Sequence, residues 1–166
     1  MYRLRKENAQ DWQQKQLKDC REDKMIGMIG FVLGTVYASF LEWWVHKELF
    51  HEHGKRKDSI FAYHLRDHHK AATQNDFIDS KRSYRESLGL LFLVILHLPV
   101  CLFSVDFYLA TVVYAIAFYI LHHYSHSNPD WARKYMPWHW KHHMQSPKKN
   151  WNVVLPIADK IMRTDR

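Results

Sequence analysis

Residues 25–51 read MIGMIGFVLGTVYASFLEWWVHKELFH, and this stretch decides the fold. Its first part is apolar for about 20 residues, long enough as a helix to cross a hydrocarbon core of roughly 30 Å. Trp43 and Trp44 follow, where aromatic side chains anchor helices at the membrane–water boundary. Three glycines have the spacing that lets helices pack closely: Gly27, Gly30 and Gly34. The stretch favours a membrane helix over 25–45, with a buried helix of a soluble protein as the alternative.

A second apolar block runs from Leu88 to Leu121 and is interrupted only around residues 104–106. Each half has about 16 residues, which is short for a helix that spans a bilayer completely. We therefore predict a tight helical hairpin, with apolar helices at about 88–104 and 107–124.

The distribution of basic residues predicts how this hairpin is oriented. No Lys or Arg lies between Arg85 and Arg133, whereas residues 46–87 hold nine and residues 127–166 hold eight. Because basic residues favour the cytoplasmic side, the tip near Asp106 should face outward and both flanks should face the cytoplasm. The polar segment 1–24 also carries seven basic residues, so charge does not decide whether the first helix spans the membrane or re-enters it.

Ten histidines form four clusters that flank the apolar stretches, and this topology places all four on one side of the membrane. The clusters are His46 and His51; His64, His68 and His69; His122 and His126; and His139, His142 and His143. Residues three or four apart share a face of a helix, so three of the clusters can converge. His46 and His51 are five apart, about 140° on a regular helix, and need a bulge, a frayed turn or one histidine for each metal.

Neutral imidazole is the commonest protein ligand for transition metals, and ten imidazoles exceed what one ion needs. We therefore predict two neighbouring metal ions at the membrane surface; a purely structural or surface role is the alternative. Three other histidines receive different interpretations. His97 is a packed polar residue within the membrane, His53 is a loop residue, and His123 supports a ligand or faces solvent.

Composition argues against several other classes of protein. The net charge is +7, from 24 Lys and Arg against 17 Asp and Glu, but these cations flank apolar segments, which suits anionic lipid headgroups better than nucleic acid. Cys20 and Cys101 alone give no disulfide framework. A zinc protease is disfavoured because the chain contains no His-Glu-x-x-His motif.

The histidine motifs His46-Lys-Glu-Leu-Phe-His51, His64-Leu-Arg-Asp-His68-His69, His122-His-Tyr-Ser-His126 and His139-Trp-Lys-His142-His143 resemble those of the fatty acid hydroxylase (sterol desaturase) superfamily. The lead-in Glu42-Trp43-Trp44 and the closing segment 152–162 are also similar, so the resemblance covers about 40–163. One departure is the second motif, which has three residues between His64 and His68 where the hydroxylase pattern usually has two. No histidine precedes His46, so we expect no appended cytochrome b5-like domain.

The resemblance implies an all-α integral membrane protein, multi-pass, with a histidine-rich cap on its cytosolic side that holds a dimetal centre. Residues 1–24 would be a polar N-terminal segment and 25–166 the membrane domain. The ten clustered histidines would be the metal ligands. Their rings would be oriented by nearby groups, for which we name Glu42, Glu48, Asp67, Asp159 and His123.

The implied activity is that of an O₂-dependent monooxygenase with two iron ions, zinc being an alternative in purified samples. Electrons would come from a separate protein of the cytochrome b5 or ferredoxin type. The substrate would be a membrane lipid, most plausibly a fatty acyl or sphingolipid-type chain. Carotenoid ring hydroxylation and sterol-type desaturation are alternatives within the superfamily, and a histidine-rich metal transporter or store is an alternative from another class.

Overall fold

The computed structural model describes residues 2–79, 81 and 83–166, and side chains from residue 11 onward. All regular secondary structure in the described chain is helical, and the described residues contain no strand. In chain order its elements are α1 (Tyr2–Trp44), η1 (Val45–Glu52), η2 (His53–Lys55), η3 (His64–His69), α2 (Lys70–Gln74), α3 (Tyr84–Leu96), η4 (Leu98–Leu102), α4 (Val105–Ser127), α5 (Pro129–Tyr135), α6 (Pro137–Met144) and α7 (Ile157–Met162).

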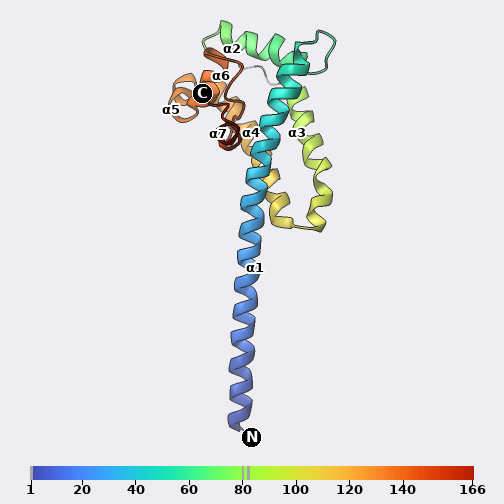
Figure 1. Cartoon of the computed structure of the whole chain (residues 1–166), viewed down its shortest axis with the longest axis vertical. Helices are drawn as coiled ribbons and strands as arrows, with labels where there is room; N and C mark the ends of the chain where they lie inside the picture. Colours follow the sequence, from blue (N-terminus) through green and yellow to red (C-terminus); the bar gives the residue numbers. More distant parts are fainter. Residues whose placement is uncertain (1, 80, 82) are drawn as a thin grey trace.

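Figure 1 shows α1 as a single long rod, with α3 and α4 as a hairpin beside its C-terminal half and the short helices gathered at that same end. The polar segment 1–24 and the apolar helix 25–45 are therefore parts of one helix without a reversal, which leaves no re-entrant turn in α1. Three helical stretches are long and apolar enough to cross a membrane: Asp11–Lys55, Tyr84–Leu102 and Val105–Ser127.

The glycines of α1 allow its close approach to the hairpin. A Cβ atom at Gly34 would lie 2.5 Å from the carbonyl oxygen of Phe107 and 2.8 Å from the Cβ of Ala110. Gly30 faces Ser104 in the same way, with 2.9 Å from its hypothetical Cβ to the hydroxyl oxygen. The small-residue spacing thus serves the α1–α4 contact, as helix packing in membranes commonly requires.

Local sequence explains where the hairpin turns. Leu98-Pro99 ends α3, because proline cannot continue the helical hydrogen bonding. Ser104 then adopts an extended backbone and its hydroxyl accepts a hydrogen bond from the Phe107 amide at 3.2 Å, which caps the start of α4. A hairpin is observed, but its bounds differ from those expected. In place of one helix at 88–104 there are α3, which ends at Leu96, and the 3-10 helix η4; α4 covers the expected 107–124.

The C-terminal tail is fastened to α1 and to itself by buried hydrogen bonds. Asp159 accepts from the backbone amides of Trp151 and Asn152, at 3.0 and 2.7 Å. The Asn152 side chain donates to the Ser39 carbonyl at 2.8 Å. Glu42 accepts from the Val153 amide at 2.7 Å. These bonds hold the tail over the end of α1 where the histidines lie.

Candidate metal centre

The helices that carry the first two histidine clusters are wound as π-helices, in which each residue bonds the fifth one along the chain. This winding brings His46 and His51 onto one face, which supplies the local bulge that their spacing demands. It also aligns His64 with His69, five residues apart, rather than with His68 as i, i+4 spacing predicted. The second cluster is therefore divided between two sites.

The structure gathers nine of the ten histidines into two groups, and within each group one ligand atom per residue lies within 4.8 Å of all the others. The first group is His46, His51, His64, His69 and His142, and the second group is His68, His122, His126 and His143. His139 adjoins the second group, since its Nε2 lies 3.1 Å from the Nε2 of His126.

The two groups are direct neighbours. His68 and His69 are consecutive in the sequence but belong to different groups. The same is true of His142 and His143. The rings of His69 and His143 stack across the boundary with their centroids 4.1 Å apart. Two ions held by these groups would therefore lie side by side, as the sequence predicted.

Five rings are oriented by an acceptor at Nδ1. The acceptors are backbone carbonyls for three of them: Trp151 for His46, Phe77 for His126 and Lys149 for His142. Carboxylates serve the other two: Asp79 accepts from His68 at 2.7 Å and Glu86 accepts from His122 at 2.9 Å. Because these acceptors fix the proton on Nδ1, the lone pair of each neutral ring is on Nε2.

These lone pairs face one another, and this is the observation that fits a metal. The Nε2 atoms of His68 and His122 are 3.1 Å apart, although neither carries a proton to share. Across both groups the close Nε2–Nε2 distances run from 3.0 Å to 3.2 Å. An ion held by imidazole at about 2.0–2.1 Å would separate neighbouring nitrogens by about 2.9 Å in octahedral and about 3.3 Å in tetrahedral geometry.

The ring nitrogens of His143 provide a second indication. Both are buried and have no hydrogen-bond partner in the part of the chain that the structure describes. A buried polar atom without a partner is costly, and ligation by an ion would satisfy it. The donor set contains only imidazole nitrogen, which suits iron and zinc.

Burial favours the neutral form of five histidines outside the membrane-spanning segments. It lowers the pKa of His142 to about 3, helped by the nearby His51. Burial, followed by neighbouring imidazoles, also holds the pKa well below its usual value for four others: His64, His69, His139 and His143. Neutral imidazole is the form that binds metal.

The supporting groups differ from those named from sequence. Asp67 is exposed and pairs with Arg66, while Glu48 pairs with Lys47. Glu42 and Asp159 fasten the tail rather than contact a histidine. His123 lies 3.8 Å from Glu86, close to the second group.

Sequence reasoning missed Glu86, Asp79 and the three carbonyls. Glu86 gave little signal, because acids are common in the first turn of a helix. Backbone carbonyls carry no signal, since every residue has one.

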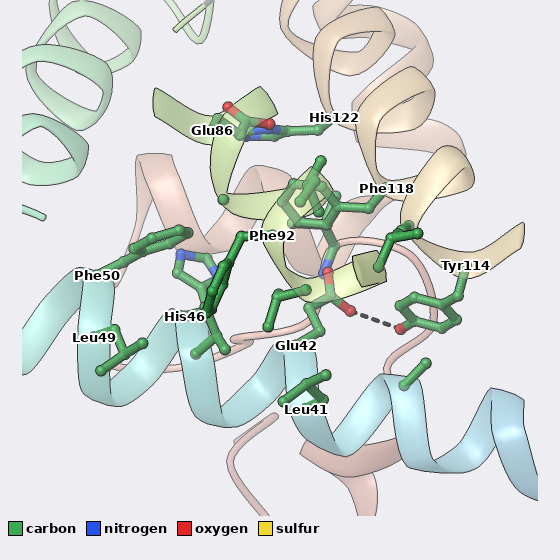
Figure 2. Close-up of a pocket in the computed structure, with 18 of the residues that line it drawn as sticks. Leu41, Glu42, His46, Leu49, Phe50, Glu86, Phe92, Tyr114, Phe118 and His122 are labelled. Carbon is green, nitrogen blue, oxygen red and sulfur yellow. Dashed lines mark hydrogen bonds and ion pairs between the residues drawn. The ribbon is translucent and has the colours of Figure 1, made fainter. Parts of the chain in front are cut away.

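An apolar pocket of about 230 Å³ lies between α1, α3 and α4 and reaches both groups. His46 and His64 of the first group and His122 of the second line it. Figure 2 shows Glu42 projecting from α1 and His46 from η1, with His122 and Glu86 on the opposite side of the pocket. The remaining walls are mostly aliphatic and aromatic, among them Leu41, Leu49, Phe50, Phe92, Tyr114 and Phe118.

Trp151 covers the first group from the side of the tail. Its ring lies edge-on to those of His51 and His142, with centroids 4.8 and 5.3 Å away. The C-terminal tail therefore packs over the site. His97 lies at the far end of the pocket, where its Nε2 accepts a hydrogen bond from the Tyr37 hydroxyl at 2.7 Å.

The family model described as fatty acid hydroxylase matches residues 31–164, a range that includes all ten histidines. The chain belongs to the fatty acid hydroxylase family. Membership implies a membrane hydroxylase-type oxidoreductase, in keeping with the three apolar helices and the histidine groups. No curated protein and no solved structure matches the chain.

Proposed function

We propose that the protein is a membrane-bound lipid hydroxylase that binds two metal ions, iron in the active form, and oxidises an acyl chain lodged in the apolar pocket. The supporting observation is that one apolar pocket is lined by histidines of both groups. An alkyl chain offers no acid, electrophile or leaving group, so acid–base catalysis alone cannot oxidise it. The metal ions supply the activation of O₂ that the reaction requires.

The overall reaction consumes one O₂, two electrons and two protons for each C–H bond converted to C–OH, and it releases one water. We assign the electrons to a separate one-electron carrier protein, of the cytochrome b5 or ferredoxin type. We place the histidine cap on the cytoplasmic face because of the distribution of basic residues. Residues 46–87 and 127–166, which include the cap, hold 17 basic residues, whereas the N-terminal arm (residues 1–24) holds seven.

The residues of this chain have three roles in the proposal. The two histidine groups hold the ions, and the acceptors at Nδ1 fix the orientation of their rings. The aromatic and aliphatic walls position the chain and exclude water from it. Trp151 closes the first group from the side of the tail.

The test is incorporation of labelled oxygen. Purified protein loaded with ferrous iron is given a reductant, ¹⁸O₂ and a panel of lipids that includes fatty acids, ceramides, carotenoids and sterols. We expect two irons per chain and ¹⁸O in an acyl lipid. His142→Ala should lose metal and product together, whereas His53→Ala should keep both, because His53 is exposed and outside both groups. Two bound irons without ¹⁸O in any lipid would contradict the proposal.

A further inference from the structure

A second hollow adjoins the metal centre and borders the apolar pocket. It has a volume of about 500 Å³ and lies among η3, the loop that precedes α3, and the end of α4. We call it the polar hollow. It shares three lining residues with the apolar pocket: His64, Glu86 and His122. An amphiphilic molecule could therefore place its tail in one and its head in the other, with the histidine groups at the junction.

The polar hollow contains cations whose charge is not used elsewhere. Of its three acids, Asp67 pairs with Arg66, while Asp79 and Glu86 accept hydrogen bonds from the imidazoles of His68 and His122. Among the residues that the structure describes, the side chains of Lys81 and Arg85 take part in no ion pair, although both line the hollow. These two cations are the groups of the hollow that can contact an anionic ligand.

Arg85 is held in place by aromatic rings. Its guanidinium carbon lies 5.7 Å from the ring centroid of Tyr63 and 5.9 Å from that of Tyr84. The Nε of Arg85 donates a hydrogen bond to the Tyr84 hydroxyl at 3.4 Å. Its two terminal nitrogens can then donate parallel hydrogen bonds to a carboxylate or phosphate.

The position of Arg85 along the chain also suits a lipid headgroup. Apolar helix α3 begins at Tyr84, so Tyr84 and Arg85 lie where the chain enters the membrane. Tyrosine and arginine are characteristic of that boundary, where lipid headgroups are found.

We propose that the polar hollow is a headgroup site for the substrate, selecting lipids with an anionic head, and that Arg85 is its main contact with Lys81 as the second. This inference rests on the proposed function, which places the alkyl tail of the lipid in the apolar pocket. It excludes uncharged lipids such as carotenoids as preferred substrates. Carboxylate and phosphate share the required chemistry, and the experiment separates them.

The test measures binding rather than turnover. Three ligands with the same alkyl chain are compared by equilibrium binding of radiolabelled material to the purified full-length protein in a neutral detergent: hexadecanoic acid, hexadecyl phosphate and hexadecanol. At about pH 8 the two acids are ionised. We expect at least one of them to bind about tenfold more tightly than the alcohol, as a charge-assisted bidentate contact allows. Whichever binds more tightly identifies the head.

The variants are chosen to isolate the charge. Arg85→Gln should reduce the preference for the anion about fivefold or more while leaving the affinity for hexadecanol unchanged. Arg85→Lys should retain part of the preference, and Lys81→Gln should lower it to a smaller extent. Arg56→Gln is the matched control, because Arg56 is an exposed cation that does not line the hollow. If Arg85→Gln does not fold, the wild-type preference should still fall as salt is raised.

The outcomes separate this inference from the hydroxylase proposal. Equal binding of all three ligands, or an unchanged preference in folded Arg85→Gln, overturns the headgroup site even if lipids are hydroxylated. An anion preference that depends on Arg85 supports the site even if no ¹⁸O enters any lipid, an outcome that would contradict the hydroxylase alone.

Discussion

Asp79 and Glu86 are the two carboxylates that hydrogen-bond the histidine groups, and both act on the second group. The first group uses carbonyl oxygens instead, from Trp151 and Lys149. A carboxylate at Nδ1 makes imidazole a stronger donor to a metal than a carbonyl does. The two sites are therefore chemically unequal, even though both consist of imidazole nitrogen.

This difference predicts a selective effect of substitution. Glu86→Ala and Asp79→Ala should each weaken metal binding at the second group by about 10–100-fold and leave the first group loaded. Titration with ferrous iron, followed by elemental analysis, should then give one tightly bound ion per chain. Asp67→Ala is the control, because Asp67 is exposed and paired with Arg66. Loss of both ions in Glu86→Ala would show that the groups do not bind independently.

Acid should destabilise the protein through its buried neutral histidines. Below about pH 6.5 the unfolded chain takes up protons, whereas burial keeps the pKa of folded His142 at about 3. The contribution of neutral His142 to the free energy of unfolding is therefore complete above about pH 6.5 and is lost as the pH falls toward about 3. Each such histidine contributes about 1.4 kcal/mol per pH unit in that window. Thermal unfolding between about pH 7 and pH 5 should show falling midpoints, with release of metal; constant midpoints would contradict this.

The ligand set illustrates what sequence reasoning can reach at this scale. The histidines of each cluster lie close together in the sequence on short helices. The residues that make up the ligand set were therefore predictable. Their assignment to ions was not, because consecutive residues such as His142 and His143 serve different groups. Three of the five acceptors at Nδ1 come from segments far away in the sequence, such as Phe77 for His126, and depend on the tertiary fold.

At the scale of elements, the π-helices η1 and η3 determine which histidines meet. A regular α-helix would place His64 with His68, and the π-winding places it with His69 instead. The spacing of His46 and His51 showed that a regular α-helix would not bring them together. It could not tell whether a bulge, a frayed turn or one histidine for each metal resolves this. The apolar helices were easier to predict, because their length and composition are properties of the sequence itself.

The contact between α1 and α4 gives a prediction about stability. Gly34→Ala would place a methyl group 2.5 Å from the Phe107 carbonyl oxygen, so backbone must move. We expect a loss of about 1–3 kcal/mol, typical of overpacking. Gly89→Ala is the matched control: its added Cβ meets nothing within 4 Å, so helix propensity should make it neutral or slightly stabilising. Unfolding in detergent measures both, and equal stability of the two variants would contradict the close contact.

At the scale of the whole molecule, α1 separates the histidine cap from the polar arm, so a bilayer crossed by α1 would have them on opposite sides. The histidine cap lies at the C-terminal end of α1, and the polar arm extends beyond the tip of the α3–α4 hairpin (Figure 1). Both the cap and the arm carry basic residues, so the positive-inside tendency depends on which of them carries more. The cap carries more basic residues than the arm, which favours the cap as the cytoplasmic side.

Thiol labelling tests this topology. Cys20 is exposed on the arm, and Lys148 is exposed on the cap. In sealed vesicles a membrane-impermeant maleimide should label Cys20 and a Lys148→Cys substitution from opposite sides. Cys101→Ala removes the thiol at the hairpin, and Cys20→Ala accompanies the Lys148→Cys reporter. Labelling of both positions from the same side would show that α1 does not cross the bilayer.

The length of α1 has a practical consequence for imaging. Its 43 residues span about 65 Å at 1.5 Å per residue, roughly twice the thickness of a bilayer core. A fiducial protein fused in helical register to the arm would move with the enzyme as one rigid body. A 20.1 kDa chain with little mass outside the membrane would then have a feature by which particles can be aligned in electron cryomicroscopy.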